Sequence, residues 1–218
     1  MDFKPFPKIP RFSRDIIITE KIDGSNGLVF IYSPKDKLRF PFCDERDIPS
    51  QEFIDKYCLS SKDELYIFSG SKNRWLNTSK NGDNHNFAKW VQLHAEELLQ
   101  LGEGKHYGEF YGSGIQRGYG LTEKRWALFN VSKWANKNEP LKEGQSYCPD
   151  CCEVVPILYE GMFDTQKINE VLEQLKTHGS YAVPYMNPEG IIIFHAASGH
   201  LYKKTIIGDE QPKGQINP

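Results

Sequence analysis

Residues 16–27 read IIITEKIDGSNG, and the interpretation of the whole chain starts from this stretch. The run Ile16 to Thr19 is β-branched throughout and favours an extended strand, because branched side chains fit a pleated sheet. The strand delivers Lys21 directly into a turn that contains Asp23 and Gly24, which are residue types that favour tight turns. The sequence therefore predicts a strand, a turn and a second strand, with one lysine at the junction.

The lysine at this junction has two interpretations. In an arbitrary sequence of the form KxDG, a solvated turn lysine between two hairpin strands is the more common case. The alternative is a nucleophilic amine, which must be uncharged near pH 7, whereas a free lysine has a pKa of about 10.4. That gap corresponds to roughly 4 to 5 kcal/mol. A nucleophilic Lys21 therefore requires burial, a second cation or a bound metal close to it.

The composition is that of a folded protein without a global excess of charge. The 218 residues are 39% hydrophobic and 13% aromatic, which is enough to fill a core. Lys and Arg number 27 against 29 Asp and Glu, so any nucleic-acid surface must be local. The sequence contains neither an apolar run of about 18 residues nor the pattern of a signal peptide. Five cysteines, an odd number, do not match a secreted disulfide framework, so we expect a cytoplasmic protein.

Short β-branched or aromatic segments recur along the chain and predict strands. These segments are residues 16–19, 28–32, 65–68, 106–111, 126–131, 190–194 and 201–207. Apolar residues at helical spacing predict helices over 87–98 and 168–175, which end near Gly102 and Gly179. Strands and helices do not alternate regularly, so we expect an α+β fold with antiparallel or mixed β-sheets flanked by helices, in a single domain of residues 1–218.

Two carboxylates occupy unusual positions in the predicted strands. Glu109 lies among aromatic residues and glycine in the segment YGEFYG. Glu189 precedes an apolar run, and if the strand starts at residue 189, alternation places its side chain on the face of Ile191 and Ile193. An unpaired carboxylate there would be costly, so we expect a cation partner for Glu189.

Two adjacent lysines, Lys203 and Lys204, interrupt the last apolar strand. Neighbouring strand residues point to opposite faces of a sheet, so one of the two at most faces a shared pocket. Taken separately, such charged residues are more often edge-strand charges or structural ion pairs than functional groups.

Taken together and in order, these segments resemble the covalent nucleotidyltransferase superfamily of ATP-dependent polynucleotide ligases and capping guanylyltransferases. The resemblance extends over residues 20–204. KIDG resembles the motif of the lysine nucleophile, and EKIDGSN is most similar to the nick-sealing RNA ligase branch. The matching segments are KIDG at 21–24, GEFYG at 108–112, WALFNV at 126–131, EGII at 189–192 and KK at 203–204.

The resemblance implies an ATP-grasp-like nucleotidyltransferase domain, the adenylation domain of ligases, and we expect no OB-fold domain because residues 205–218 alone follow the last motif. It also implies a three-step ligation that uses ATP and Mg²⁺ or Mn²⁺. Lys21 attacks the α-phosphate of ATP to form lysyl-AMP, and AMP then moves to a 5′-phosphate end. A 3′-hydroxyl finally displaces AMP and seals the strand.

The resemblance also implies roles for individual residues. Glu109 would bind the ribose hydroxyls, Phe129 would stack on adenine with Trp126 as the alternative ring, and Glu189 would act through the metal. Either Lys203 or Lys204 would contact the α-phosphate and supply the second cation near the nucleophile. The residues around Lys21 that would form the nucleotide-binding loop are Glu20, Ile22, Asp23, Gly24 and Asn26.

Three features depart from the family pattern. A Ser-Arg pair usually lies between the first and third motifs, but here Lys72 follows Ser71 and Arg74 comes two residues later. Either Lys72 or Arg74 would read a phosphate, although lysine lacks the two-pronged arginine fork. Asn130 follows Phe129 where the family commonly has Asp, and the lysines of the last motif are adjacent instead of two residues apart.

Two other segments receive no assigned role. The glycine-rich residues 112–120 match neither common phosphate-loop spacing, and Arg117 within them would either touch a substrate phosphate or lie in a plain surface loop. The segment CPDCC at 148–152 has the C-x-x-C spacing of metal sites, but a structural zinc usually takes four ligands from two such pairs. The sequence offers no second pair, and its six histidines are scattered.

The main hypothesis is therefore an ATP-dependent RNA ligase that acts on RNA ends or nicked duplexes. With a net charge of −2, we expect weak and salt-dependent binding to nucleic acid unless a protein partner adds affinity. A minimal ATP-dependent DNA ligase is the nearest alternative, because Asp23 is equally typical of DNA ligases. A nucleotide-binding module that has lost end joining is the other, suggested by Lys72 and Asn130. A capping enzyme is less favoured without an OB-fold.

Overall fold

The computed structural model describes residues 3–34 and 48–208, which form two compact units. Unit 1 comprises Met1–Ile22 and Val155–Pro218, and unit 2 comprises Asp23–Val154. The chain thus passes from one unit to the other inside the KIDG stretch. The sequence predicts a single domain over residues 1–218, and this stays a prediction. Cys43 and the tail from residue 209 lie outside the described residues.

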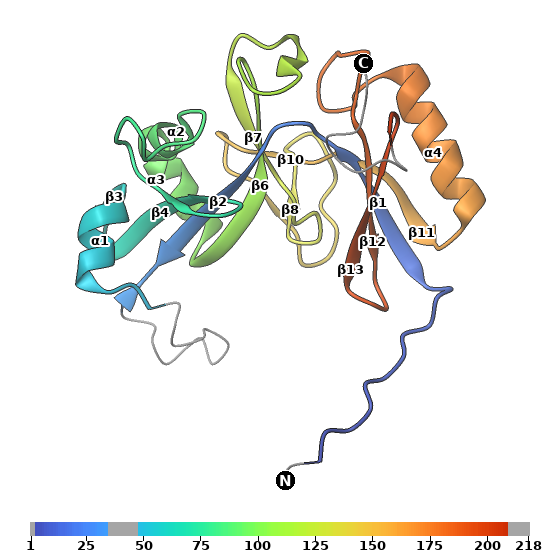
Figure 1. Ribbon diagram of the computed structural model, residues 1–218, viewed down its shortest axis with the longest axis horizontal. Helices are drawn as coiled ribbons and strands as arrows, with labels where there is room; N and C mark the ends of the chain where they lie inside the picture. The colour runs from blue at the N-terminus through green and yellow to red at the C-terminus, as the bar shows by residue number, and fades with distance from the viewer. Residues whose placement is uncertain (1–2, 35–47, 209–218) are drawn as a thin grey trace. The chain divides into compact units, whose positions relative to one another are not determined.

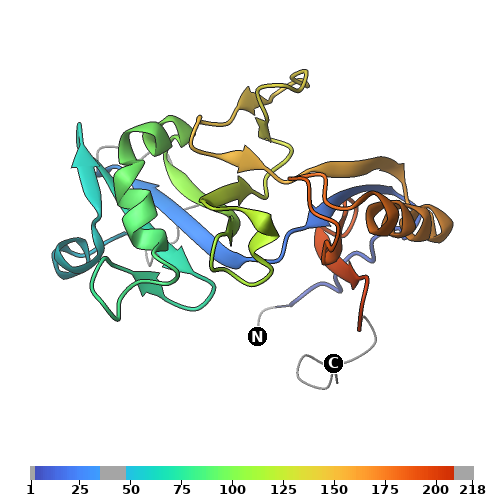
Figure 2. The same cartoon turned by 90° about the horizontal axis from the view of Figure 1, so that it is seen from above.

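Unit 1 is an antiparallel sheet with one helix packed on a face (Figure 1). Its strand order is β11-β1-β12-β13, with β1 at Asp15–Lys21, β11 at Ile157–Met162, β12 at Gly190–His195 and β13 at His200–Thr205. Helix α4 (Thr165–His178) is capped at its N-terminus by Asp164, whose side chain accepts the N–H of Gln166, and at its C-terminus by Gly179. Figure 2 shows the same helix from above, beside this sheet.

Strand alternation decides which side chains of unit 1 face the helix. Ile16 and Ile18 of β1 are fully buried, and with Ile191 and Ile193 of β12 they pack against the apolar residues of α4. The α4 residues in this core are Ile168, Val171, Leu172 and Leu175. The odd-numbered β1 residues, which end with Lys21, lie on the opposite face of the sheet.

Unit 2 is built on a larger sheet in the order β10-β7-β6-β2-β4-β3, with β5 paired to β4. Its strands are β2 (Ser25–Tyr32), β3 (Ser60–Lys62), β4 (Leu65–Ser71), β5 (Trp75–Leu76), β6 (Gly104–Gly112), β7 (Lys124–Leu128) and β10 (Glu153–Val154). A small separate sheet pairs β8 (Trp134–Ala135) with β9 (Ser146–Tyr147). The helices are α1 (Gln51–Tyr57), α2 (Phe87–Leu93), α3 (Ala95–Leu98), η3 (Leu99–Leu101) and η4 (Gly118–Gly120).

Helix α2 packs on this sheet through aromatic rings. The ring centroid of Phe87 lies 4.8 Å from that of Phe110 and 5.8 Å from that of Trp126. Two glycines that pair across β2 and β6 make room for these rings. A Cβ on Gly27 would lie 2.6 Å from the Phe87 ring, and one on Gly108 would lie 2.7 Å from the indole nitrogen of Trp126.

The α+β class predicted from the sequence is confirmed. Five of the seven predicted strands lie within an observed strand. The other two, predicted over 126–131 and 201–207, overlap β7 and β13 but extend too far, since β7 ends at Leu128 and β13 at Thr205. The helix predicted over 87–98 is broken at His94, where α2 ends and α3 begins. The sequence did not predict α1, β3, β5, β8, β9, β10 or β11. Within residues 3–34 and 48–208, the helices are all too short or too polar to cross a membrane.

Candidate active site

Lys21 is the last residue of β1 and forms an ion pair with Glu189. The Nζ atom lies 2.5 Å from Oε2 of Glu189, and the two side chains are 20% and 12% exposed. The expected cation partner of Glu189 is thus confirmed, and it is Lys21 itself. A nucleophilic Lys21 requires burial, a second cation or a bound metal close to it, whereas the contact observed is with an acid.

Gly190 explains how Glu189 reaches the amine. Strand β12 begins at Gly190, so the condition under which Glu189 would share the face of Ile191 and Ile193 is not met. Gly190 has φ 158°, and a Cβ there would lie 2.2 Å from the carbonyl oxygen of Lys204. The backbone at residue 189 is fixed by an N–H donated from Ile206 at 2.9 Å. Glycine is therefore required at this position for the chain to run so close to β13.

The strand register separates the two adjacent lysines of β13. Lys203 pairs with Ile192, which in turn pairs with Thr19, so Lys203 lies on the same sheet face as Lys21. Lys204 lies on the opposite face, toward α4, where its Nζ donates to Oδ1 of Asn169 at 3.0 Å. Of the two lysines, Lys203 is the one on the face of the candidate nucleophile.

Glu20 is buried next to Lys21, at 1% exposure. Its Oε2 accepts the backbone N–H of Tyr181 at 2.8 Å and that of Ala182 at 3.2 Å. Burial raises the pKa of the Glu20 carboxyl above its ordinary value, against the opposing effect of these hydrogen bonds. The side chain thus anchors residues 181–182 to β1 on the face covered by α4.

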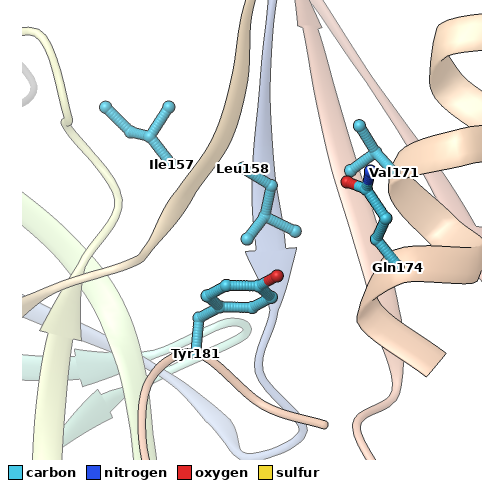
Figure 3. Close-up of a pocket in the computed structure, with 5 residues that line it drawn as sticks. All are labelled: Ile157, Leu158, Val171, Gln174 and Tyr181. Atoms are coloured by element: carbon cyan, nitrogen blue, oxygen red, sulfur yellow. The ribbon is translucent and has the colours of Figure 1, made fainter. Parts of the chain in front are cut away.

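The ring of Tyr181 lines a small pocket between β11 and α4 (Figure 3). The other lining residues are Ile157, Leu158, Val171 and Gln174. The cavity measures about 80 Å³, whereas ligand pockets usually start at roughly 300 Å³. This pocket is too small to hold a nucleotide.

In unit 2, Glu109 holds the turn that follows the lysine. Its Oε1 accepts the backbone N–H of Gly24 at 3.0 Å. A Cβ on Gly24 would lie 2.4 Å from the carbonyl oxygen of Phe110, so a glycine is needed for this close approach. Asn26 pairs with Glu109 across β2 and β6, and Ile22, just before the turn, is buried.

Asp23 is fixed by two residues of the glycine-rich segment 112–120. The hydroxyl of Tyr119 accepts its backbone N–H at 2.8 Å, and Nε of Arg117 lies 2.9 Å from Oδ2 of its carboxylate. Arg117 thus forms an ion pair with Asp23, and the sequence did not suggest Asp23 as its partner. Tyr119 was missed altogether, and its one signal was an aromatic ring within a run of glycines.

The two rings proposed for adenine stacking have different environments. Trp126 is fully buried between α2 and the sheet, which excludes it as an exposed stacking platform. Phe129 is 40% exposed. It does not lie in a strand, as predicted, but directly after β7, where its N–H donates to the carbonyl oxygen of Tyr107 at 2.9 Å.

The two candidate phosphate readers, Lys72 and Arg74, also differ. Arg74 donates from its guanidinium to the backbone oxygens of residues 81, 82 and 83, at 3.5, 3.0 and 2.8 Å. It therefore holds its own loop together. Lys72 is exposed in the turn between β4 and β5. Asn130, at the position where the family commonly has Asp, accepts the N–H of Lys133 in a turn at 3.1 Å.

One comparison with known proteins identifies a family. The model of a family described as RNA ligase matches residues 14–205. No curated protein matches the chain. Among solved structures, a Naegleria gruberi RNA ligase mutant with ATP and Mn is 16% identical with a TM-score of 0.49, and covers 88% of this chain and 48% of its own.

Two further structures from that organism give similar values. An RNA ligase mutant with AMP and Mn is 16% identical, with a TM-score of 0.49. The match covers 88% of this chain and 49% of that one. The RNA ligase with PPi is 16% identical, with a TM-score of 0.48 and the same coverage. The chain spans about half the length of these proteins. On the match over residues 14–205, the chain belongs to the RNA ligase family.

Proposed function

We propose that this chain is an ATP-dependent RNA ligase that joins 3′-hydroxyl and 5′-phosphate ends through a lysyl-AMP intermediate on Lys21. The observation that carries the proposal is the setting of Lys21, a half-buried amine against the carboxylate of Glu189. The turn behind it is fixed by Glu109, Arg117 and Tyr119. Membership of the RNA ligase family supports the same function.

In the first step, Nζ of Lys21 attacks the α-phosphorus of ATP. A nitrogen–phosphorus bond forms, the bond to the pyrophosphate oxygen breaks, and the amine loses a proton. The carboxylate of Glu189 is in contact with Nζ and is positioned to receive that proton. Carboxylate oxygens are also the ligands that Mg²⁺ and Mn²⁺ prefer, so Glu189 fits a metal ligand. A divalent ion held there would neutralise charge on the phosphates.

Other residues of the chain bind and orient the nucleotide in this proposal. Lys203 contacts the α-phosphate, because it lies on the sheet face of Lys21 while Lys204 is engaged with α4. Phe129, which is partly exposed, stacks on adenine. Glu109 accepts hydrogen bonds from the ribose hydroxyls as well as from the N–H of Gly24. Lys72, which is exposed, reads a phosphate, since Arg74 holds its own loop.

AMP then passes from Lys21 to the 5′-phosphate of an RNA end, and a 3′-hydroxyl attacks that activated phosphate. AMP leaves, and the phosphodiester bond forms. Ordered positioning of both ends supplies most of the rate enhancement in this step.

Incubation with α-labelled ATP and Mg²⁺ or Mn²⁺ tests the first step. We expect an acid-labile AMP adduct on the wild-type chain and none on Lys21→Ala, while Lys176→Ala, an exposed lysine on α4, keeps wild-type labelling. The absence of an adduct from wild-type protein that still binds ATP would support the nucleotide-binding module instead. Preferential labelling by GTP would point to capping.

Nicked duplexes with ribose or deoxyribose at the nick test the strand preference. An RNA ligase seals the nick with ribonucleotides at its ends and shows a much lower rate on the all-DNA substrate. Equal or faster sealing of the DNA nick would favour the minimal DNA ligase.

A further inference from the structure

Three potential metal ligands from distant parts of unit 2 lie together. The ligand atoms of His94, Glu97 and Cys151 are all within 4.8 Å of one another. His94 and Glu97 are one helical turn apart, and Nδ1 of the first lies 3.1 Å from Oε1 of the second. Cys151 belongs to the CPDCC segment between β9 and β10. None of the three takes part in the ligase chemistry proposed above.

The break in the helix occurs at this cluster. His94 ends α2 and begins α3, with φ −98° and ψ 17°. Its ring also contacts Trp90, with centroids 4.6 Å apart. The histidine side chain is therefore held by a ring contact with Trp90 on one side and lies beside the carboxylate of Glu97 on the other.

The cysteine segment presents a second thiol beside the first. The Sγ atoms of Cys151 and Cys152 are 3.7 Å apart. Two thiolates bound to one tetrahedral zinc at about 2.3 Å each are separated by roughly 3.8 Å. The segment forms a turn in which the N–H of Cys152 donates to the carbonyl oxygen of Pro149. The thiol of Cys148 donates to the backbone oxygen of Cys152. All these cysteines are free thiols.

We propose that His94, Glu97 and Cys151, whose ligand atoms lie together, form a structural binding site for zinc in which the neighbouring thiol of Cys152, next to that of Cys151, supplies the fourth ligand. A mixed set of imidazole, thiolate and carboxylate ligands suits Zn²⁺ and is poorly suited to Mg²⁺ or Ca²⁺, which take oxygen ligands. Cys148 orients Cys152 through its hydrogen bond. The helical residues His94 and Glu97 thus supply two ligands and the adjacent Cys151 and Cys152 the other two, whereas Cys148, the first cysteine of the C-x-x-C pair, is not a ligand.

Such a site would tie the α2–α3 region to the chain just before β10. The ligands His94 and Cys151 are far apart in sequence, and β10 adds a parallel strand at the edge of the sheet through its pairing with β7. A metal that closes a long loop stabilises the folded state, because the unfolded chain loses conformational freedom. The site is therefore structural, and it stands independently of the proposed ligase activity.

Metal analysis of the purified chain tests the site. After expression with added zinc and extensive dialysis, we expect about one zinc per chain in the wild type and a small fraction of that in Cys151→Ser and His94→Ala. Cys58→Ser is the matched control, since Cys58 is a half-buried free thiol of unit 2 outside the cluster, and it should keep the wild-type zinc content. Circular dichroism verifies that each variant is folded.

Cobalt substitution supplies a readout that does not depend on folding differences or on activity. Co²⁺ added to the metal-free wild type should give sulfur-to-cobalt charge-transfer bands and the visible bands of tetrahedral cobalt, both weakened in Cys152→Ser. A folded wild-type chain that takes up neither zinc nor cobalt would overturn the proposal. So would a zinc content in Cys151→Ser equal to that of Cys58→Ser. Lys21→Ala should keep its zinc, which separates this proposal from the ligase assignment.

Discussion

The two halves of the KIDG stretch are held in different ways. Lys21, on the side of unit 1, contacts Glu189 through a side-chain ion pair. Asp23 and Gly24, on the side of unit 2, are fixed through their backbone N–H groups and through the Asp23 carboxylate. An ion pair between two side chains can be exchanged for contacts with a substrate, whereas backbone hydrogen bonds set the path of the chain. The arrangement thus combines an exchangeable amine with a fixed turn.

The largest expected effect comes from removing the partner of the amine. Glu189→Gln should lower the rate of AMP adduct formation by about 10²-fold to 10⁴-fold, because the proposed proton acceptor and metal ligand is lost. A time course of labelling with α-labelled ATP at saturating concentration, quenched at intervals, measures this rate. Glu173→Gln, on the exposed side of α4, serves as the control and should react like the wild type. A Glu189→Gln rate within twofold of the control would contradict the role of Glu189.

A substitution in the fixed turn at Asp23 and Gly24 should lower the free energy of unfolding. Gly24→Ala places a methyl group 2.4 Å from the carbonyl oxygen of Phe110, and we expect a loss of about 1–3 kcal/mol in the free energy of unfolding. Urea unfolding measures this loss. Gly102→Ala is the comparison, since its φ of 76° carries backbone strain but its Cβ would meet no atom within 4 Å. Equal losses in both variants would mean that the close approach at Gly24 is not what requires glycine.

A smaller effect on the free energy of unfolding is expected from the ion pair between Arg117 and Asp23. Arg117 and Asp23 have side chains that are 26% exposed each, so we expect a coupling of about 0.5–1 kcal/mol between them. A double-mutant cycle with Arg117→Ala and Asp23→Asn, followed by urea unfolding, measures this coupling. A coupling of zero would show that Tyr119 and Glu109 fix the turn without Arg117.

The smallest effect is expected at Glu20, and it depends on pH. Burial raises the pKa of this carboxyl in the folded state, so its contribution to stability is present at acidic pH and is lost as the pH rises through that raised pKa. Glu20→Gln removes the ionisation and keeps an oxygen for the N–H of Tyr181. The stability of the variant relative to the wild type should therefore increase from pH 4 to pH 8. A relative stability that falls with pH would contradict the burial argument.

The sequence predicted the parts of the fold that depend on local patterns. The β-branched run at residues 16–19 predicted β1, because branched side chains favour strands, and the helical spacing from Ile168 to Leu175 predicted α4, because burial repeats with the period of the helix. Strand ends were less accurate, since the position where β7 stops is set by its partner strand. The break at His94 has no strong local signal, such as proline or glycine.

The candidate site was predictable where it rests on single motifs and not where it rests on pairing. KIDG identified Lys21, but the choice between Lys203 and Lys204 needed the register of β12 with β13. The contacts of Arg117 and Tyr119 with Asp23 join residues more than ninety positions apart. The link between His94 and Cys151 is of the same kind. Such contacts follow from tertiary packing, which no local spacing encodes.

Peptide mapping of the chain after reaction with ATP and Mn²⁺ tests the central claim most directly. Mass spectrometry at neutral pH, where the phosphoramidate survives, locates the AMP group on a single residue. The account predicts that it is attached to Lys21 and disappears after acid treatment. An AMP group on any other residue, or a chain that binds ATP with Lys21 unmodified, would contradict it.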